Sequence, residues 1–313
     1  MNAGAEAPAA LDVPPDELLG RIEATALELA RAAGREITEG LRRDLAVDYK
    51  TEGRGRAAPT NPVSELDRSI EATIRTALAE RFPDHGIIGE EVDLHPSPDD
   101  EYLWVIDPVD GTTNFVNGFP LFACSIGVLH RGRPVVGAVW TSTSHELRPG
   151  VFHARAGGPL RFEEAEISLR GNTGVQRRLA AAPGGSAGRL RTWDNRVTGS
   201  TSVECVFVAA GMFNSAAFGA PAIWDVAGGI VLVRAAGLEV WQRQAPFRGA
   251  WAPFERFEAP ATVREDRTPT MRDWRRSLVI GEHEPVEVRR TSMRGPSRWR
   301  RFKRGLRRRL GRG

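Results

Sequence analysis

The stretch WVIDPVDGTTNF, residues 104–115, joins an apolar run to two aspartates and a glycine turn. Asp107 and Asp110 stand three residues apart where the apolar run ends, and Gly111 follows them directly. Pro108 stiffens the exit from a predicted strand, and Gly111 permits a backbone geometry that a side chain would block. The two threonines that follow can open a helix, and the unpaired N–H groups of a helix N-terminus bind phosphate. The stretch therefore predicts paired carboxylates beside an anion site.

Three further acids adjoin apolar segments that should be buried: Glu90 in IIGEE, Asp67 in NPVSELD and Asp225 in IWD. Carboxylates gathered in one region repel each other and lose hydration, and a bound divalent cation resolves that conflict. Oxygen donors without His or Cys favour Mg²⁺ over Zn²⁺. Together with an anion site, these acids predict metal-assisted hydrolysis of a phosphate ester.

The spacing of apolar residues predicts a mixture of helices and strands. Helices are expected at 16–43, from about Ser64 to the RFPDHG segment, at 202–213 and at 223–237. Strands are expected at 86–89, 102–107, 123–132, 134–141 and 276–281, with strands and loops across 151–198. A second predicted anion-binding turn precedes the third helix and consists of Gly199, Ser200 and Thr201.

The bulk composition is that of a soluble globular protein. The chain has 313 residues, of which 41% are hydrophobic and 27% charged. No apolar run approaches the roughly 20 residues that span a bilayer. Residues 1–14 lack the pattern of a secretion signal and are expected to form a disordered leader. Cys124 and Cys205 lie in apolar stretches, which favours buried thiols in a cytoplasmic protein.

The last 25 residues, 289–313, contain twelve Arg or Lys and no acid, which leaves a net charge of −9 on the rest of the chain. One interpretation is a disordered, solvated tail. The alternative is a cationic amphipathic helix whose apolar stripe consists of Trp299, Phe302, Leu306 and Leu310. Such a helix suits an anionic membrane surface, whereas nucleic acid, the competing partner, needs no apolar stripe. We therefore favour a peripheral tether at the inner membrane surface.

These segments resemble the inositol monophosphatase family of Mg²⁺-dependent, lithium-sensitive phosphatases. The most specific block is DPVDGTTNF, and IIGEE, NPVSELD, RVTGSTSVE and WDVAGG accompany it in the family's order over roughly residues 15–240. The resemblance implies an α+β and α/β fold layered αβαβα, of the type shared with fructose-1,6-bisphosphatase. It implies an N-terminal α+β metal-binding half at 15–150 and a C-terminal α/β half at 151–288, before the tail. Relatives are commonly homodimers.

The resemblance also implies a site that holds two to three Mg²⁺ ions. Glu90, Asp107 and the main-chain carbonyl of Val109 would hold the first ion. Asp107, Asp110 and Asp225 would hold the second. Glu90 would also help to hold a third, mostly water-coordinated ion.

The resemblance assigns the catalytic and phosphate-binding groups to neighbouring segments. Asp67 and Thr112 would orient the attacking water, with Asp67 taking its proton. The backbone N–H groups of Gly111 and Thr112 would bind the phosphate. Lys50 matches a mobile lysine of the family, and a solvated loop charge explains it equally well.

The substrate side departs from the inositol-specific members of the family. In those members a glutamate seven residues before the aspartate of WD bonds the sugar hydroxyls, and here that position is Phe218. A phenyl ring cannot accept a hydroxyl hydrogen bond. The expected substrate is a small phosphorylated metabolite: inositol phosphate, histidinol phosphate, fructose bisphosphate or 3′-phosphoadenosine phosphate. The alternative is a non-catalytic adaptor for a membrane or nucleic acid, against which the complete set of metal acids argues.

Overall fold

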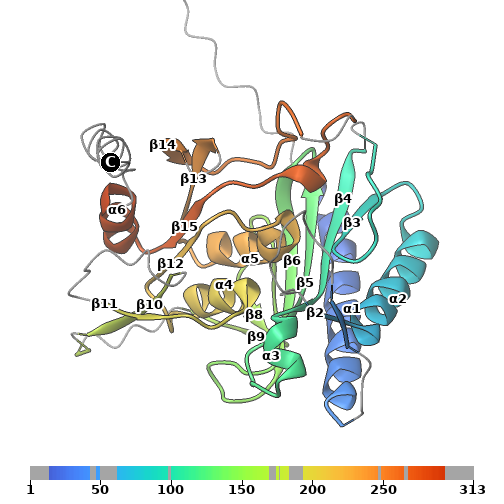
Figure 1. Ribbon diagram of the computed structural model, residues 1–313, viewed down its shortest axis with the longest axis horizontal. Coiled ribbons are helices and arrows are strands. Elements are labelled where there is room, and N and C mark those ends of the chain that lie inside the picture. Colours follow the sequence, from blue (N-terminus) through green and yellow to red (C-terminus); the bar gives the residue numbers. More distant parts are fainter. Residues whose placement is uncertain are drawn as a thin grey trace, which may run out of the picture.

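The structure of the chain is a computed structural model (Figure 1). It describes residues 14–42, 47–49, 62–97, 100–168, 174–175, 177–182, 193–245, 248–263 and 267–292. The predicted leader up to residue 13, Lys50 and residues 293–313 of the predicted tail lie outside these ranges.

Helices and sheets alternate in the order α, β, α, β, α across the described residues, which confirms the predicted layering (Figure 1). The first layer holds α1 (Asp16–Gly40) and α2 (Glu65–Arg81). Both helices bury apolar residues three or four positions apart, so that one face of each packs on the neighbouring sheet. A short antiparallel pair, β1 (Val47–Tyr49) and β2 (Pro62–Ser64), leads into α2. No helix within the described ranges is both long and apolar enough to cross a membrane.

The second layer is a sheet that, among the described residues, has seven strands in the order β3-β4-β5-β6-β7-β8-β9. They are β3 (Gly86–Gly89), β4 (Tyr102–Asp110), β5 (Ala123–His130), β6 (Arg133–Thr141), β7 (Gly150–Arg155), β8 (Arg161–Phe162) and β9 (Ala165–Glu166). β3 runs parallel to β4, and the later pairs are antiparallel. Because β7 pairs with β6 and β8 with β7, this sheet continues past the boundary that we predicted at residue 150.

The third layer holds α4 (Thr201–Ala209) and α5 (Ile223–Ala235), which lie between the two sheets (Figure 1). The fourth layer is a sheet with six described strands in the order β11-β10-β12-β15-β13-β14. They are β10 (Arg178–Ala181), β11 (Trp193–Arg196), β12 (Ser215–Phe218), β13 (Glu239–Ala245), β14 (Arg248–Pro253) and β15 (Leu278–Gly281). Two short helices, α3 (Thr112–Val116) and η1 (Met271–Asp273), lie in connections.

The last layer is α6 (His283–Ser292), whose Val286 packs on the outer face of the six-stranded sheet. Arg289 of this helix is 3% exposed and donates from Nε to Ser215 Oγ at 2.7 Å. Its Nη2 donates to Asn195 Oδ1 at 3.0 Å. Residues 289–292 therefore belong to the folded body, and the tail boundary predicted at 289 was wrong. The basic composition of this segment does not indicate that the guanidinium of Arg289 is buried and hydrogen-bonded.

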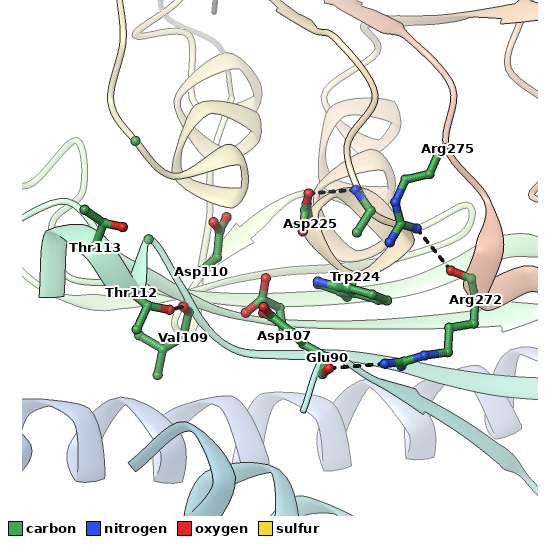
Figure 2. A pocket seen from close by; sticks show the side chains of 13 residues that line it. Glu90, Asp107, Val109, Asp110, Thr112, Thr113, Trp224, Asp225, Arg272 and Arg275 are labelled. Carbon is green, nitrogen blue, oxygen red and sulfur yellow. Dashed lines mark hydrogen bonds between the residues drawn. The ribbon is translucent and has the colours of Figure 1, made fainter. Parts of the chain in front are cut away.

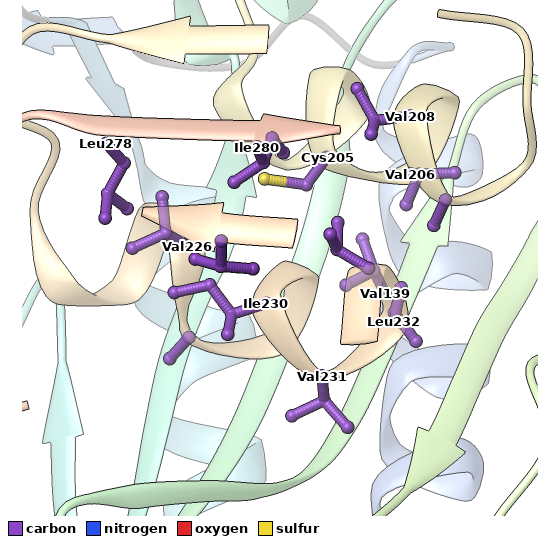
Figure 3. Close-up of a cluster of buried hydrophobic side chains, with 14 of the residues drawn as sticks. Val139, Cys205, Val206, Val208, Val226, Ile230, Val231, Leu232, Leu278 and Ile280 are labelled. Atoms are coloured by element: carbon purple, nitrogen blue, oxygen red, sulfur yellow. The ribbon is translucent and has the colours of Figure 1, made fainter. Parts of the chain in front are cut away.

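The core depends on a close approach between α5 and the seven-stranded sheet (Figure 3). A Cβ added at Gly127 of β5 would lie 2.7 Å from the backbone N of Gly228. Gly127 on the strand and Gly228 of the WDVAGG segment thus let the helix backbone reach the strand. This contact fixes the position of Asp225, one turn earlier in α5. Cys124 and Cys205 are buried thiols, as predicted.

Candidate active site

Four of the five predicted acids line one cavity of about 410 Å³, and Figure 2 shows their side chains around a common space. Glu90 follows β3, Asp107 and Asp110 end β4, and Asp225 lies in the first turn of α5. Residues from both halves of the chain complete the lining: Val109, Gly111, Thr112, Thr113, Gly199, Ala222, Trp224, Arg272 and Arg275.

A bulge at the end of β4 aims two of these acids into the same space. Residues three apart on a regular strand point to opposite faces of a sheet. The pairing with β5 shifts between Asp107, opposite Ser125, and Asp110, opposite Ala123. One extra residue on β4 therefore reverses the alternation, as β-bulges do next to functional sites. The short spacing of the two aspartates is explained by this shift.

The turn after β4 has the geometry that its sequence predicts. Gly111 has φ 89° and ψ 34°, a left-handed conformation that glycine adopts without strain. It caps α3, and the hydroxyl of Thr112 in the first turn lies 2.8 Å from the carbonyl oxygen of Val109. The same hydroxyl lies 3.2 Å from Asp67 Oδ1, which reaches it from α2. The predicted water-orienting pair, Asp67 and Thr112, is therefore adjacent in the structure.

Glu71 on α2 supports the segment that carries Glu90, and the sequence analysis missed it. Its carboxylate is fully buried and accepts hydrogen bonds from the backbone N–H groups of Glu91 at 2.7 Å and Val92 at 3.2 Å. Arg75, one turn later, pairs with it at 2.8 Å. The signal was available, because an acid four residues after Asp67 lies on the same buried helix face.

The second predicted anion-binding turn has a different use in the structure. Ser200 caps α4 through its side chain, and the backbone N–H of Ser202 donates to Asp110 Oδ2. Gly199 lines the cavity, whereas Ser200 and Thr201 are absent from its described lining. The N-terminus of α4 therefore holds a predicted metal ligand, since a carboxylate satisfies its N–H groups as well as a phosphate would.

Asp225 is held by the start of its own helix. Its Oδ2 accepts a hydrogen bond from the backbone N–H of Ala222 at 2.8 Å, as an acid in the first turn commonly does. The neighbouring Trp224 is half-buried and extends along the wall of the cavity (Figure 2). The WD pair thus contributes one carboxylate and one aromatic wall to the site.

Burial raises the pKa values of three cavity acids. The pKa of Asp107 lies well above its usual range because its carboxyl is buried, and then because the charges of Glu90 and Asp110 repel it. Burial raises the pKa of Asp110 to about 6, although hydrogen bonds from Ser202 oppose the shift. Burial and the charge of Asp110 raise the pKa of Asp225 to about 8. A bound cation would relieve this mutual destabilisation.

The donor set fits a hard divalent cation. Oδ1 of Asp107 is buried and has no hydrogen-bond partner among the described residues. An unpaired anionic oxygen in the interior is costly unless a cation binds it. Within the described ranges, no three His, Cys, Asp or Glu side chains lie close enough together to hold one metal ion without moving. We favour a shared metal site because the four acids line one cavity, and carboxylates that lack a counterion stay apart by repulsion.

Two arginines on the opposite side of the cavity were missed by the sequence analysis. Arg272 and Arg275 come from the connection between β14 and β15, and both line the cavity beside Trp224 (Figure 2). The only local signal was the cluster MRDWRRS in a weakly patterned segment. Nothing in that cluster indicates which fold element it faces, so periodicity could not have placed it.

Two other predicted site residues lie elsewhere. Phe218 ends β12 and packs in the core between the sheets with 4% of its surface exposed. It is not part of the described cavity lining. An aromatic ring at the end of a central strand is better buried among apolar neighbours than in a cavity of carboxylates. Lys50 lies outside the described residues.

Comparison with known proteins identifies one family. Residues 19–248 match the model of the inositol monophosphatase family. A tomato (Solanum lycopersicum) protein named inositol monophosphatase 3 is 34% identical over 229 residues, which cover 68% of this chain and 82% of that protein.

Two solved structures share the fold. Inositol monophosphatase from Anabaena superposes with a TM-score of 0.64 at 22% identity, covering 88% of this chain and 96% of that chain. An IMPase/NADP phosphatase complexed with NADP and Ca²⁺ gives a TM-score of 0.60 at 17% identity, covering 71% of this chain and 84% of that chain. Arg272 and Arg275 lie beyond residue 248, where the family match ends.

Proposed function

This chain belongs to the inositol monophosphatase family of phosphoric monoester hydrolases, and on that premise we propose that it is a Mg²⁺-dependent phosphatase of a small phosphorylated metabolite. The observation that carries the proposal is the convergence of Glu90, Asp107, Asp110 and Asp225 on one cavity, beside the Thr112–Asp67 pair. The family is metal-dependent in general, and a solved relative is complexed with Ca²⁺.

We assign two to three Mg²⁺ ions to the acids of the cavity. Glu90, Asp107 and the carbonyl of Val109 would hold one ion, and Asp107 would share a second with Asp110 and Asp225. Bound ions of this kind supply Lewis acidity at phosphoryl oxygens and ready a water molecule for attack at neutral pH. The orphaned Oδ1 of Asp107 supports a ligand shared between two ions.

The remaining groups of the cavity position water and phosphate. Asp67 is 1% exposed and reaches the Thr112 hydroxyl, so this pair can orient a water molecule and accept its proton at the Asp67 carboxylate. Gly111, Thr112 and Thr113 line the cavity at the start of α3. We assign the phosphate to the backbone N–H groups of this turn, because the first N–H groups of a helix have no partner within the helix.

The substrate is the least constrained part of the proposal. The printed names of relatives include inositol monophosphatases and an NADP phosphatase, so inositol phosphate and nucleotide phosphates are both candidates. Histidinol phosphate, fructose bisphosphate and 3′-phosphoadenosine phosphate complete the candidate set. Phe218 replaces the acid that bonds sugar hydroxyls in inositol-specific members, and it lies in the core. That replacement disfavours myo-inositol phosphate.

Phosphate release from a panel of these esters tests the proposal. We expect activity to require Mg²⁺, to fall when Li⁺ is added, and to drop by about a hundredfold or more in Asp107→Asn. Asp194→Asn is the matched control, because Asp194 lies on β11 outside the cavity lining and pairs with Arg177. Turnover by Asp107→Asn at the parent rate would show that the site is misplaced. Absence of turnover by the parent on every ester would favour the non-catalytic adaptor.

We further propose that residues 293–313 tether the enzyme to an anionic membrane surface. The support is the cationic composition of this segment together with its apolar stripe at Trp299, Phe302, Leu306 and Leu310. Liposome co-sedimentation with and without this segment tests the tether, as set out in the Discussion. Nucleic acid is the competing partner in the same assay.

A further inference from the structure

The connection between β14 and β15 places two arginine side chains, Arg272 and Arg275, at the wall of the cavity. The proposed phosphatase chemistry gives these side chains no role. The four carboxylates account for metal binding, and the Thr112–Asp67 pair accounts for the water. Figure 2 shows Thr112 and Thr113 at one end of the cavity and Arg272 and Arg275 at the other, with the carboxylates between them. The arginines therefore lie at the end of the cavity opposite the assigned phosphate position. We expect the leaving group of the substrate to occupy this end.

This connection is fixed by its own polar contacts. Arg267 donates from Nη1 and Nη2 to the two carboxylate oxygens of Asp273 at 2.8 and 2.6 Å. The same carboxylate accepts the backbone N–H of Thr270 at 2.9 Å, which closes the turn of η1. Hydrogen bonding to Arg267 lowers the pKa of Asp273 to about 2, so the pair stays ionised. Such a two-point contact holds the loop in one geometry before any substrate binds.

Arg272 ties the loop to the segment that carries Glu90. Its Nε donates to Asp93 Oδ1 at 2.9 Å, and its Nη2 donates to the carbonyl oxygen of Glu90 at 3.2 Å. Its Nη1 donates to the carbonyl oxygen of Gly89. Only 11% of the side chain is exposed. With all three nitrogens on protein acceptors, Arg272 is built to position its neighbours.

Arg275 is placed against Trp224 and against Arg272. The guanidinium carbons of Arg272 and Arg275 lie 4.9 and 5.0 Å from the centroid of the Trp224 ring. Figure 2 shows the ring nearly edge-on, with one guanidinium on each side of it. Nη1 of Arg275 donates to the carbonyl oxygens of Arg272 at 3.0 Å and Trp274 at 2.7 Å. Stacking and these two hydrogen bonds preorganise a positive charge at the cavity wall.

We propose that Arg275 forms a subsite for a second anionic group of the substrate, a phosphate or a carboxylate on the leaving group, and that Arg272 holds this subsite in place. The inference rests on the proposed phosphatase function. Arginine recognises such anions through charge and a planar fork of donors. Both faces of Trp224 are covered by guanidinium groups, so the ring is not a platform for stacking a base. A cavity of about 410 Å³ accommodates a small sugar or acid that carries two anionic groups.

Matched pairs of substrates test the subsite. Fructose 1-phosphate and fructose 1,6-bisphosphate differ by a second phosphate, and glycerol 3-phosphate and 3-phosphoglycerate differ by a carboxylate. We expect kcat/KM to be about tenfold higher for the doubly anionic member of at least one pair, the gain from one charge-assisted contact. Whichever pair shows the preference identifies the second anion as phosphate or carboxylate.

Variants of the two arginines separate recognition from support. Arg275→Met should bring the ratio within the preferred pair close to one, because it should lower kcat/KM for the doubly anionic ester more than for the singly anionic ester. Arg275→Lys should keep part of the preference, since it retains the charge without the fork. Arg276→Met is the control, because Arg276 donates to backbone carbonyls of Arg243 and Gln244 outside the cavity lining. Arg276→Met should keep the parent ratio.

A binding measurement distinguishes failure of the subsite from failure of the phosphatase function. Calorimetry with the same pairs in Ca²⁺, the ion present with NADP in a solved relative, reports selectivity without turnover. Selective binding that Arg275→Met abolishes supports the subsite even if no ester is hydrolysed. Turnover or binding without preference for the doubly anionic member overturns it. An equal loss for both members of a pair in Arg275→Met also overturns it, because it assigns Arg275 to loop support.

Discussion

At the scale of single residues, the carboxylates of this protein differ in the groups that each one contacts. Asp110 accepts a helix N–H from Ser202, Asp273 is ion-paired with Arg267, and Asp107 keeps a buried oxygen without a partner in the described structure. The first two arrangements stabilise the charge, whereas the third destabilises it. A sequence shows five similar acids, and only their neighbours distinguish a ligand from a support.

Glu204 behind the cavity gives a pH-dependent test at this scale. It is 7% exposed, its Oε1 accepts hydrogen bonds from the backbone N–H and the hydroxyl of Thr198, and burial raises its pKa to about 7. The folded state therefore binds this proton more tightly than the unfolded state does. The resulting stability is full below about pH 4.5 and is lost as the pH rises to about 7.

We therefore expect Glu204→Gln, which mimics the protonated acid, to gain stability relative to the parent between pH 5 and pH 8. The relative gain should be on the order of 2 kcal/mol, since one pKa unit is worth about 1.4 kcal/mol. Urea unfolding in EDTA at both pH values measures it, and Glu258→Gln, an exposed residue paired with Arg256, serves as the control. A parent–variant difference that is equal at the two pH values would contradict the assignment.

At the scale of elements, the ends of strands and helices do the positioning. The bulge in β4 turns Asp107 and Asp110 to one side, the N-terminus of α4 holds Asp110, and the first turn of α5 presents Asp225. These ends meet because α5 packs on β5 through Gly228. The site is therefore built on rigid elements, which hold catalytic groups more accurately than free loops do.

The left-handed turn at Gly111 is the element most sensitive to substitution. Any residue at this position must adopt φ 89°. A Cβ added there would lie 3.1 Å from the carbonyl oxygen of Leu121 and from Ser200 Cβ. We expect Gly111→Ala to lose about 1–2 kcal/mol of stability and at least about tenfold in kcat/KM, because the strain moves the phosphate-binding N–H groups. Gly118→Ala is the control, since it has φ 69° with nothing within 4 Å of the added Cβ. Gly118→Ala should lose stability, measured by urea unfolding, and keep the parent kcat/KM, measured by phosphate release. An unaltered kcat/KM in Gly111→Ala would refute the role of the turn.

At the scale of the whole molecule, the layers bring together segments that are distant in sequence. Arg272 donates to the carbonyl oxygen of Glu90 across 182 positions of sequence, and this contact joins the connection before β15 to the edge of the first sheet. The cavity is thus closed by a segment outside the family match, at the end opposite the assigned phosphate position. We expect this segment to contribute to the substrate specificity of the site, because Arg272 and Arg275 line the cavity.

The proposed membrane tether also belongs to this scale. We expect the full chain to sediment with vesicles that contain anionic lipid and to remain soluble with neutral vesicles, with binding weakened by salt. A variant that ends at Ser292 keeps Arg289 and its contacts in α6, so it should fold and lose only the binding. Equal sedimentation of both forms would end the idea. Displacement by nucleic acid at low concentration, without lipid selectivity, would favour the competing partner.

The sequence by itself predicted helices α1, α2, α4 and α5, strands β3 to β6 and β15, the turn at Gly111 and the four acids that line the cavity, whereas α6 was not predicted. Those features follow from local physics: apolar periodicity, backbone freedom at glycine, and the repulsion of carboxylates next to buried segments. Only the tertiary structure decided that α4 holds Asp110, that Phe218 lies in the core, and that Arg289 is buried in α6. It also decided that Arg272 and Arg275 face the acids. Each of these depends on a contact between distant segments, and the neighbours of a residue along the chain contain no record of such a contact.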